Sequence, residues 1–290
     1  MVKRLVSAAK AGTGDTAGTL FLVSTPIGNL GDMSHRAVEV LSSAALVIAE
    51  DTRHSRRLLD HYGIRTPLLS YHEHNEAKAA PKLVSRLRAG DSIALISDAG
   101  TPLISDPGSR LVAAALEANV KIVPIPGPTA VMAALVGSGL PLDRFTFFGF
   151  LPRKGRERAA IIAEIVDSTA TVALFEAANR VAATLEALVE AGAGARQAVL
   201  ARELTKQFEE FKRGTVAELA NVYSKGDPKG EVVLMIARGN EREISKSDLE
   251  NAAEKLRALG KSPREVMEHL VSTLGASRNA AYRIAHHSES

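Results

Sequence analysis

Three polar segments of this chain carry residues that could bind a ligand or take part in catalysis. Residues 24–30 read STPIGNL, residues 49–54 read AEDTRH, and residues 97–108 read SDAGTPLISDPG. In the second segment, a carboxylate and a cation at Asp51 and Arg53 could orient a hydroxyl or a phosphate, and Asp51 or His54 could accept a proton. A purely structural ion pair is the alternative.

The segment at 97–108 is the strongest candidate for a ligand-binding loop. Its small residues, Gly100 above all, let the backbone come close to a ligand, and Asp98 and Asp106 can accept hydrogen bonds from amines or hydroxyls. The segment at 24–30 has similar features, with Gly28 for close approach and Thr25 as a short polar side chain. An ordinary turn explains that first segment equally well.

All three segments directly follow a predicted strand. Short apolar runs bounded by turn residues predict buried parallel strands at 19–24, 46–49, 92–97 and 120–124. Amphipathic segments at 34–41 and 75–89 predict helices between them. Alternating strands and helices indicate an α/β domain, in which ligands bind at the carboxyl ends of the strands.

The rest of the chain predicts a second α/β domain and a helical appendage. Strands are expected at 145–150, 171–175, 197–201 and 232–237, some of them antiparallel, and helices at 248–259, 262–274 and 277–285. We expect the last three helices to pack against the body rather than to read nucleic acid. The predicted organisation is a flexible tail (1–18), an N-terminal domain (19–124), a linker or hinge (125–143), a C-terminal domain (144–240) and the appendage (241–290).

Composition bounds the class of protein. The chain has 290 residues, of which 46% are hydrophobic, and a formal net charge of +3. It contains no cysteine, which excludes disulfides, thiolate metal sites and a cysteine nucleophile and suits a cytoplasmic protein. No secretory signal and no membrane-spanning stretch is evident, so we expect a soluble protein.

The order of the motifs resembles that of a known family. Residues 97–108 are similar to the cofactor loop of the tetrapyrrole-methylase-like family of S-adenosylmethionine-dependent methyltransferases. The segments TPIGNL, AEDTRH, SDAGTP and PGPT occur in the order found in the branch of that family that modifies ribosomal RNA, and LARELTK at 200–206 extends the resemblance. It covers residues 19 to 239.

The resemblance implies two α/β domains with S-adenosyl-L-methionine folded in the cleft between them, a homodimer, and 2′-O-methylation of a cytidine in the decoding centre of 16S rRNA within the 30S subunit. Asp51, Arg53 and His54 are then the candidate catalytic residues. The expected cofactor contacts are Thr25, Pro26, Gly28, Asp98, Ala99, Gly100, Thr101, Pro102, Pro126, Gly127, Glu176 and Glu203.

Contact with RNA also requires positive surface. The loop at 150–158 (FLPRKGRER) supplies Arg153, Lys154, Arg156 and Arg158, although a merely solvated loop has the same composition. His72 and His74 follow a predicted strand at 68–71; with no third ligand nearby, substrate contact is favoured and no metal is expected. The fragment GTGD at 12–15 precedes the first strand, so it is not a dinucleotide fingerprint.

Two other functions are also compatible with the sequence. A methyltransferase acting on a tetrapyrrole or another small molecule would share the architecture but would not need the cationic loop or the AEDTRH segment. A non-catalytic ribosome-assembly factor that only senses the cofactor would not need so many polar side chains at one crevice. Methyl transfer to 30S particles, compared with transfer to uroporphyrinogen, separates these possibilities.

Overall fold

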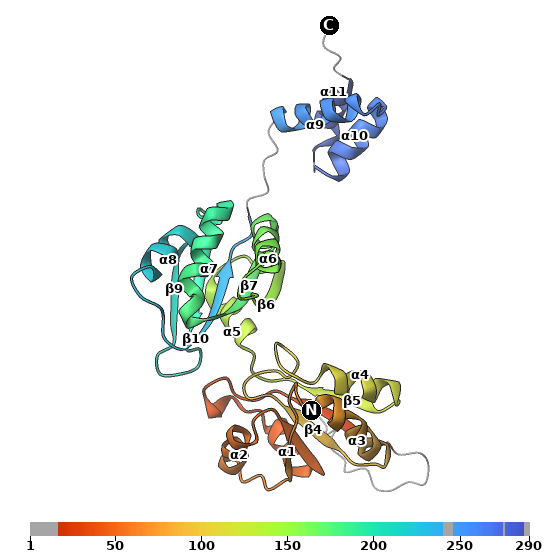
Figure 1. Ribbon diagram of the computed structural model, residues 1–290, viewed down its shortest axis with the longest axis vertical. Coiled ribbons are helices and arrows are strands. Elements are labelled where there is room, and N and C mark those ends of the chain that lie inside the picture. The colour runs from red at the N-terminus through yellow and green to blue at the C-terminus, as the bar shows by residue number, and fades with distance from the viewer. Residues whose placement is uncertain (1–16, 240–245, 275, 287–290) are drawn as a thin grey trace, which may run out of the picture. The chain divides into compact units, whose positions relative to one another are not determined.

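The computed structural model describes residues 17–239, 246–274 and 276–286. It divides into two compact units, Met1–Arg238 and Gly239–Ser290 (Figure 1). The GTGD fragment at 12–15 and most of the predicted tail lie outside the described residues. None of the helices in the described ranges is long and apolar enough to cross a bilayer.

The first sheet of the larger unit is parallel throughout, with strand order β3-β2-β4-β1-β5. Two of its central strands, LVIA and IALI, are buried at every position, as expected for a parallel sheet covered on both faces. Its strands are β1 (Thr19–Val23), β2 (Leu46–Ala49), β3 (Leu68–Ser70), β4 (Ile93–Ile96) and β5 (Lys121–Ile125).

Helices cover both faces of this sheet (Figure 1). Apolar side chains of α1 and α2 pack on one face, and those of α3 and α4 pack on the other. The connections are η1 (Leu30–Asp32), α1 (His35–Ser43), α2 (Thr52–His61), α3 (Glu76–Arg88) and α4 (Ser109–Glu117). The loops that follow β1, β2 and β4 therefore emerge at the same edge of the sheet, which brings the three polar segments together.

The second sheet is mixed, with strand order β6-β7-β10-β8-β9. β6 and β7 are parallel, whereas β10 pairs antiparallel with β7 and β8, and β8 pairs antiparallel with β9. Its strands are β6 (Phe145–Phe150), β7 (Thr171–Ala177), β8 (Gln197–Arg202), β9 (Glu210–Thr215) and β10 (Glu231–Ile236). The predicted fold class, two α/β domains with some antiparallel strands in the second, is confirmed.

The helices of the second domain also form two layers. Helix α5 packs on one face of the sheet, while α6, α7 and α8 share a core with the other face. They are α5 (Ala130–Ser138), α6 (Arg156–Asp167), η2 (Ala178–Arg180), α7 (Val181–Leu188), η3 (Val189–Ala193) and α8 (Val216–Tyr223). The segment 125–143, interpreted from its Pro/Gly content as a linker, thus contains a helix that belongs to the core of this domain.

The smaller unit consists of α9 (Lys246–Ala258), α10 (Pro263–Ser272) and α11 (Arg278–His286). Val266 and Leu270 are fully buried in its own apolar core. The Ser262 hydroxyl accepts from the amide of Glu265, whose carboxylate accepts from the amide of Ser262 at 2.9 Å, so a capping box begins α10. Its packing against the rest of the chain stays a prediction.

Candidate active site

A cavity of about 430 Å³ lies where strand ends of the two sheets face one another in the larger unit. That volume is typical of small-molecule sites. The loop after β4, the starts of α5 and β10 and the ends of β6 and β7 form its walls. The lining residues are Ile27, Asp98, Ala99, Gly100, Thr101, Ile104, Ser105, Asp106, Thr129, Ala130, Phe150, Phe175, Glu176, Ala177, Leu204, Gly230, Glu231, Val232 and Val233.

Hydrogen bonds join three loops into one wall of this cavity. The amides and carbonyls of Thr25 and Gly100 pair as an isolated antiparallel bridge, with N···O distances of 2.8 and 3.0 Å. The Thr25 hydroxyl donates to the carbonyl of Ser97 at 3.2 Å, and the Thr101 hydroxyl donates to the carbonyl of Pro128 at 3.2 Å. The loops after β1, β4 and β5 are therefore held in a fixed arrangement.

Close approach and unusual backbone geometry mark the loop after β4. Gly100 has φ +83, and a Cβ there would lie 3.3 Å from Cγ2 of Ile27. Leu103 and Ser105 adopt the left-handed region, with φ of 72 and 66. Left-handed non-glycine residues cost about 1–3 kcal/mol each and concentrate at functional sites, so this loop is held in its shape by its surroundings.

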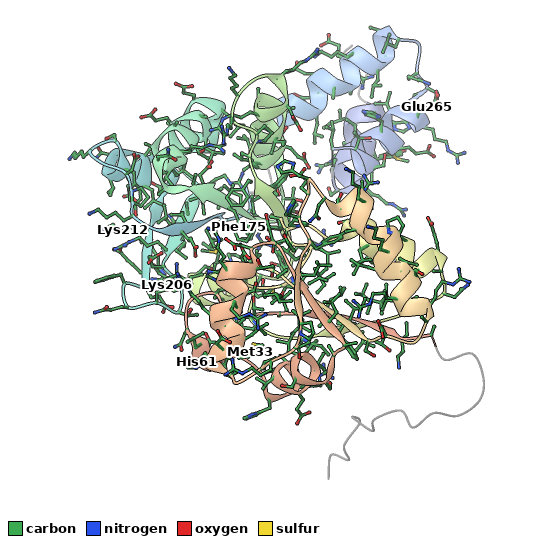
Figure 2. The ribbon with its side chains drawn as sticks, turned by 60° about the horizontal axis from the view of Figure 1, so that its bottom comes forward. Met33, His61, Phe175, Lys206, Lys212 and Glu265 are labelled. Atoms are coloured by element: carbon green, nitrogen blue, oxygen red, sulfur yellow. The ribbon has the colours of Figure 1, made fainter. Side chains whose placement is uncertain are left out.

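The second domain contributes aromatic rings to the cavity. Phe150 and Phe175 both line it, and their ring centroids lie 5.3 Å apart. Phe175 also meets the ring of Phe147 edge to face, at 4.9 Å, which fixes its orientation on the second sheet (Figure 2). The ring of Phe150 is 56% exposed and is free to stack with a planar group.

Glu176 lies beside these rings and is fully buried. Its carboxylate pairs with Arg180 Nε at 3.2 Å and accepts from the Thr184 hydroxyl at 2.5 Å. Arg180 in turn donates to the carbonyl of Leu151 at 2.7 Å. Glu176 therefore belongs to a closed hydrogen-bond network that holds the end of β7 against the helix that follows.

Glu203 does not line the cavity, but it positions the next residue, Leu204, which does. Its carboxylate accepts from Lys206 Nζ at 3.0 Å and from the amide of Glu231 at 3.1 Å, and these hydrogen bonds lower its pKa. Its φ of 51 turns the chain so that Leu204 lines the cavity. The side chain of Lys206, labelled in Figure 2, lies close to the first domain, since a Cβ added at Gly28 would be 2.5 Å from the Cγ of Lys206.

The charge that lines the cavity is negative. Four acidic residues line it, Asp98, Asp106, Glu176 and Glu231, and none of the lining residues in the described part of the chain is a lysine or an arginine. Burial, together with the charges of Glu50 and Asp98, raises the pKa of Asp106 to about 6. Burial and the charge of Asp98 also raise the pKa of Glu50, which follows β2. A ligand with positive charge would relieve this repulsion.

The three candidate catalytic residues lie at the start of α2. Asp51 Oδ1 accepts from the amides of Arg53 and His54, at 2.8 and 3.4 Å, so this carboxylate caps the helix. These hydrogen bonds, that of Arg53 first, lower its pKa. The amide of Asp51 donates to Asp98 Oδ1 at 3.2 Å, which places this turn next to the cavity although none of the three residues lines it.

The candidate RNA contacts fall into two places. Arg153 and Lys154 are exposed in the loop after β6, and Arg156 is exposed at the start of α6. Arg158 is partly buried and donates to the carbonyl of Pro152 and to the Thr184 hydroxyl, at 3.3 and 2.9 Å, so its guanidinium is engaged within the chain.

The two candidate histidines follow β3. The rings of His72 and His74 meet edge to face with centroids 5.9 Å apart, and His72 Nδ1 is buried without a hydrogen-bond partner. No group of three or more His, Cys, Asp or Glu side chains in the described part of the chain is placed to hold a metal ion.

The cavity brings together only part of the predicted cofactor set. Asp98, Ala99, Gly100, Thr101 and Glu176 line it. Thr25, Pro26, Gly28, Pro102, Pro126, Gly127 and Glu203 do not, and they lie in the loops that support its walls. The aromatic wall and the apolar residues of β10 were not expected to line a site, because in sequence they are indistinguishable from core positions.

Comparison with known proteins identifies the family of this chain. The sequence profile of the Tetrapyrrole (Corrin/Porphyrin) Methylases matches residues 19–220. The chain belongs to the tetrapyrrole methylase family. The match covers the first sheet and all of the second sheet except β10, and it ends within α8.

Two relatives within the tetrapyrrole methylase family carry the name ribosomal RNA small subunit methyltransferase I. That of Mesorhizobium japonicum is 47% identical over 91% of this chain and 90% of its own length. That of Synechocystis is 48% identical over 83% of this chain and 87% of its own length. A uroporphyrin-III C-methyltransferase from Thermus thermophilus, solved with S-adenosylhomocysteine, shares the fold with a TM-score of 0.56 and 17% identity, covering 76% of this chain and 97% of that one.

Proposed function

We propose that this chain transfers a methyl group from S-adenosyl-L-methionine to the 2′-hydroxyl of a cytidine ribose in the decoding centre of 16S rRNA, within the 30S subunit. The observation that carries the proposal is the likeness to two proteins named ribosomal RNA small subunit methyltransferase I, at 47% and 48% identity over most of the chain. Such work on ribosomal subunits belongs in the cytoplasm.

The charge of the cavity supports the choice of methyl donor. S-adenosylmethionine carries a sulfonium and an ammonium, so its binding places positive charge among Asp98, Asp106 and the other lining carboxylates. A cofactor with several phosphates, such as a nicotinamide dinucleotide, would meet repulsion from the same groups. Gly100 leaves room for close approach of the ligand to the loop after β4.

The transfer itself requires alignment more than covalent chemistry. The ribose oxygen must stand behind the methyl carbon, in line with its bond to sulfur, and alignment of this kind can supply about 7–11 kcal/mol of the barrier. In this chain the cross-linked loops after β1, β4 and β5 hold one partner in place, and the wall with Phe150 offers a surface for a base. A carboxylate is needed to accept the proton.

RNA reaches this cavity from the side of the cationic loop. Arg153, Lys154 and Arg156 are exposed and lie three to six residues after Phe150 in the chain, so phosphates bound there would flank the cavity mouth. Arg158 is left out of this group because its guanidinium bonds within the chain. His72 and His74, near the turn after β2, are proposed as further substrate contacts.

We also propose a homodimer, on the evidence of α5. This helix is apolar from end to end, but Met132 and Val136 on its outer side are 45% and 71% exposed. A helix that is apolar all round is normally buried, so we expect a second copy of the chain to pack against the exposed side of α5.

Purified protein incubated with radiolabelled S-adenosylmethionine tests the proposed function. The substrates are 30S particles from a strain that lacks this gene and, in a parallel reaction, uroporphyrinogen. We expect label in the 16S rRNA of the 30S particles alone. Label in uroporphyrinogen would make the chain a small-molecule methyltransferase, and no transfer to either would favour a non-catalytic assembly factor.

A further inference from the structure

Asp106 lies at the end of the loop after β4, on the part of the cavity wall nearest the second domain. The left-handed residues Leu103 and Ser105 turn the loop so that Ile104, Ser105 and Asp106 all line the cavity. The Ser105 hydroxyl lies 3.2 Å from the place where a Cβ on Gly149 would be. This loop therefore abuts the end of β6, next to the exposed ring of Phe150.

The surroundings of Asp106 make it an unusual carboxylate. The charged groups that act on it are Glu50, after β2, and Asp98, after β4; both are negative, and the Ser97 hydroxyl only partly offsets them. Of the other acids that line the cavity, Glu176 pairs with Arg180 and Glu231 pairs with Lys206. Among the described residues no cation pairs with Asp106, and its pKa of about 6 makes it a stronger base than an ordinary aspartate.

The candidates at the start of α2 are less suited to accept a proton. The Asp51 carboxylate already accepts from two backbone amides, and its pKa is lowered. A carboxylate with a lowered pKa is a weaker base. His54 is exposed and does not line the cavity. Phe150 and Asp106, by contrast, both line the cavity, and the loop that carries Asp106 meets the end of β6 at Gly149, so a nucleoside whose base stacks on Phe150 would have its ribose on the side of this loop.

We propose that Asp106 is the catalytic residue that accepts the proton of the ribose 2′-hydroxyl during methyl transfer. The inference rests on the proposed function. In the step, the ribose oxygen forms a bond to the methyl carbon while the bond between that carbon and sulfur breaks. The electron pair of that bond goes to sulfur, which leaves neutral S-adenosylhomocysteine, and the hydroxyl proton passes to the Asp106 carboxylate.

The test is the single-turnover rate of methyl transfer to 30S particles with saturating S-adenosylmethionine, measured from pH 5 to pH 9, a window of about two units either side of neutrality. Saturation separates the chemical step from any change in cofactor affinity. For the parental protein the rate should rise about tenfold per pH unit below the pKa of Asp106 and level off above it. The positive sulfonium lowers that pKa, so we expect the rate to level off at a pH of about 6 or lower.

In Asp106→Asn, we expect the plateau rate to fall roughly 10²–10⁴-fold and the acidic limb to disappear. Asp106→Glu keeps a carboxylate and should restore part of the rate together with the limb. Asp167→Asn, an exposed aspartate at the end of α6, is the matched control and should behave as the parent. Thermal melting of each variant reports whether its fold is intact.

A parental rate and pH profile in folded Asp106→Asn would overturn the assignment, as would a larger fall in Asp51→Asn than in Asp106→Asn. If Asp106→Asn does not fold, Asp106→Glu tests the assignment instead. A rate of Asp106→Glu below one-hundredth of the parental rate, with no acidic limb in its pH profile, would overturn the assignment of Asp106. Failure of the proposed function would be distinguishable, because the parental protein would then transfer no methyl group to 30S particles. In that case the assignment of Asp106 would also be wrong.

Discussion

The buried network around Glu176 gives a prediction whose magnitude follows from the structure. Its side chain is fully buried and the side chain of Arg180 is 24% exposed. Removal of one partner of a buried ion pair costs about 3–5 kcal/mol, because the other charge is left without compensation. Arg180 keeps two carbonyl partners, those of Leu151 and Pro152 at 2.7 and 3.1 Å, so the lower end of that range applies.

Glu176→Ala should therefore lower the free energy of unfolding by about 3 kcal/mol. For a unit of this size, that loss corresponds to a melting temperature lower by about 6–12 °C. Glu176→Gln keeps an acceptor oxygen and should lose about 1–2 kcal/mol. Urea unfolding followed by circular dichroism measures both variants, and Glu186→Ala, an exposed glutamate on α7, is the control, expected within about 0.5 kcal/mol of the parent.

An unchanged urea midpoint in Glu176→Ala would refute this reasoning. It would mean that the free energy the carboxylate gains from Arg180 and Thr184 in the folded chain does not exceed the free energy of its desolvation. A loss in Glu176→Gln as large as that in Glu176→Ala would show instead that the charge, and not the hydrogen-bond geometry, holds the end of β7 in place.

Three further predictions concern binding and assembly. Gly100→Val should abolish S-adenosylmethionine binding in calorimetry, because a branched side chain at φ +83° would crowd Ile27 in the cavity wall. Gly63→Val is the control, because Gly63 has a similar φ of +66° but no described atom lies within 4 Å of a Cβ placed there. This control variant should bind S-adenosylmethionine normally. Replacement of Arg153, Lys154 and Arg156 by Gln should weaken 30S binding and reduce its logarithmic salt slope by about one unit per lost phosphate contact, with cofactor affinity unchanged; an unaltered slope would remove the loop from the interface. Val136→Asp should convert the dimer to a monomer in light scattering, and a parental protein already of one chain's mass at micromolar concentration would contradict the dimer.

The sequence predicted the elements whose pattern is strong. The strand at residues 46–49 was predicted with the bounds of β2, because a short apolar run between turn residues is typical of a buried parallel strand. β9 (Glu210–Thr215) was missed because its sequence, EFKRGT, is charged, as is common for an exposed edge strand. The helix α5 was hidden by the prolines and glycines that surround it in sequence.

The candidate site was predictable only in part, because a cavity depends on how two sheets pack. The loop after β4 could be identified, since small residues and carboxylates follow a buried strand. The left-handed backbone at Leu103 and Ser105 leaves no trace in their residue types. The same limit applies to Asp51, whose capping of α2 depends on where the helix begins, and to Phe150, which reads as an ordinary strand residue.

In the proposed function, the acid-lined cavity delivers a methyl group to a ribose of 16S rRNA. The most direct test is mass spectrometry of nucleosides from 16S rRNA after purified protein has reacted once with 30S particles and isotopically labelled S-adenosylmethionine. We expect labelled 2′-O-methylcytidine at a single position in the decoding centre, lost in the cavity variant Gly100→Val and retained in Gly63→Val. Label on a base, label spread over many positions, or no label in the RNA would contradict it.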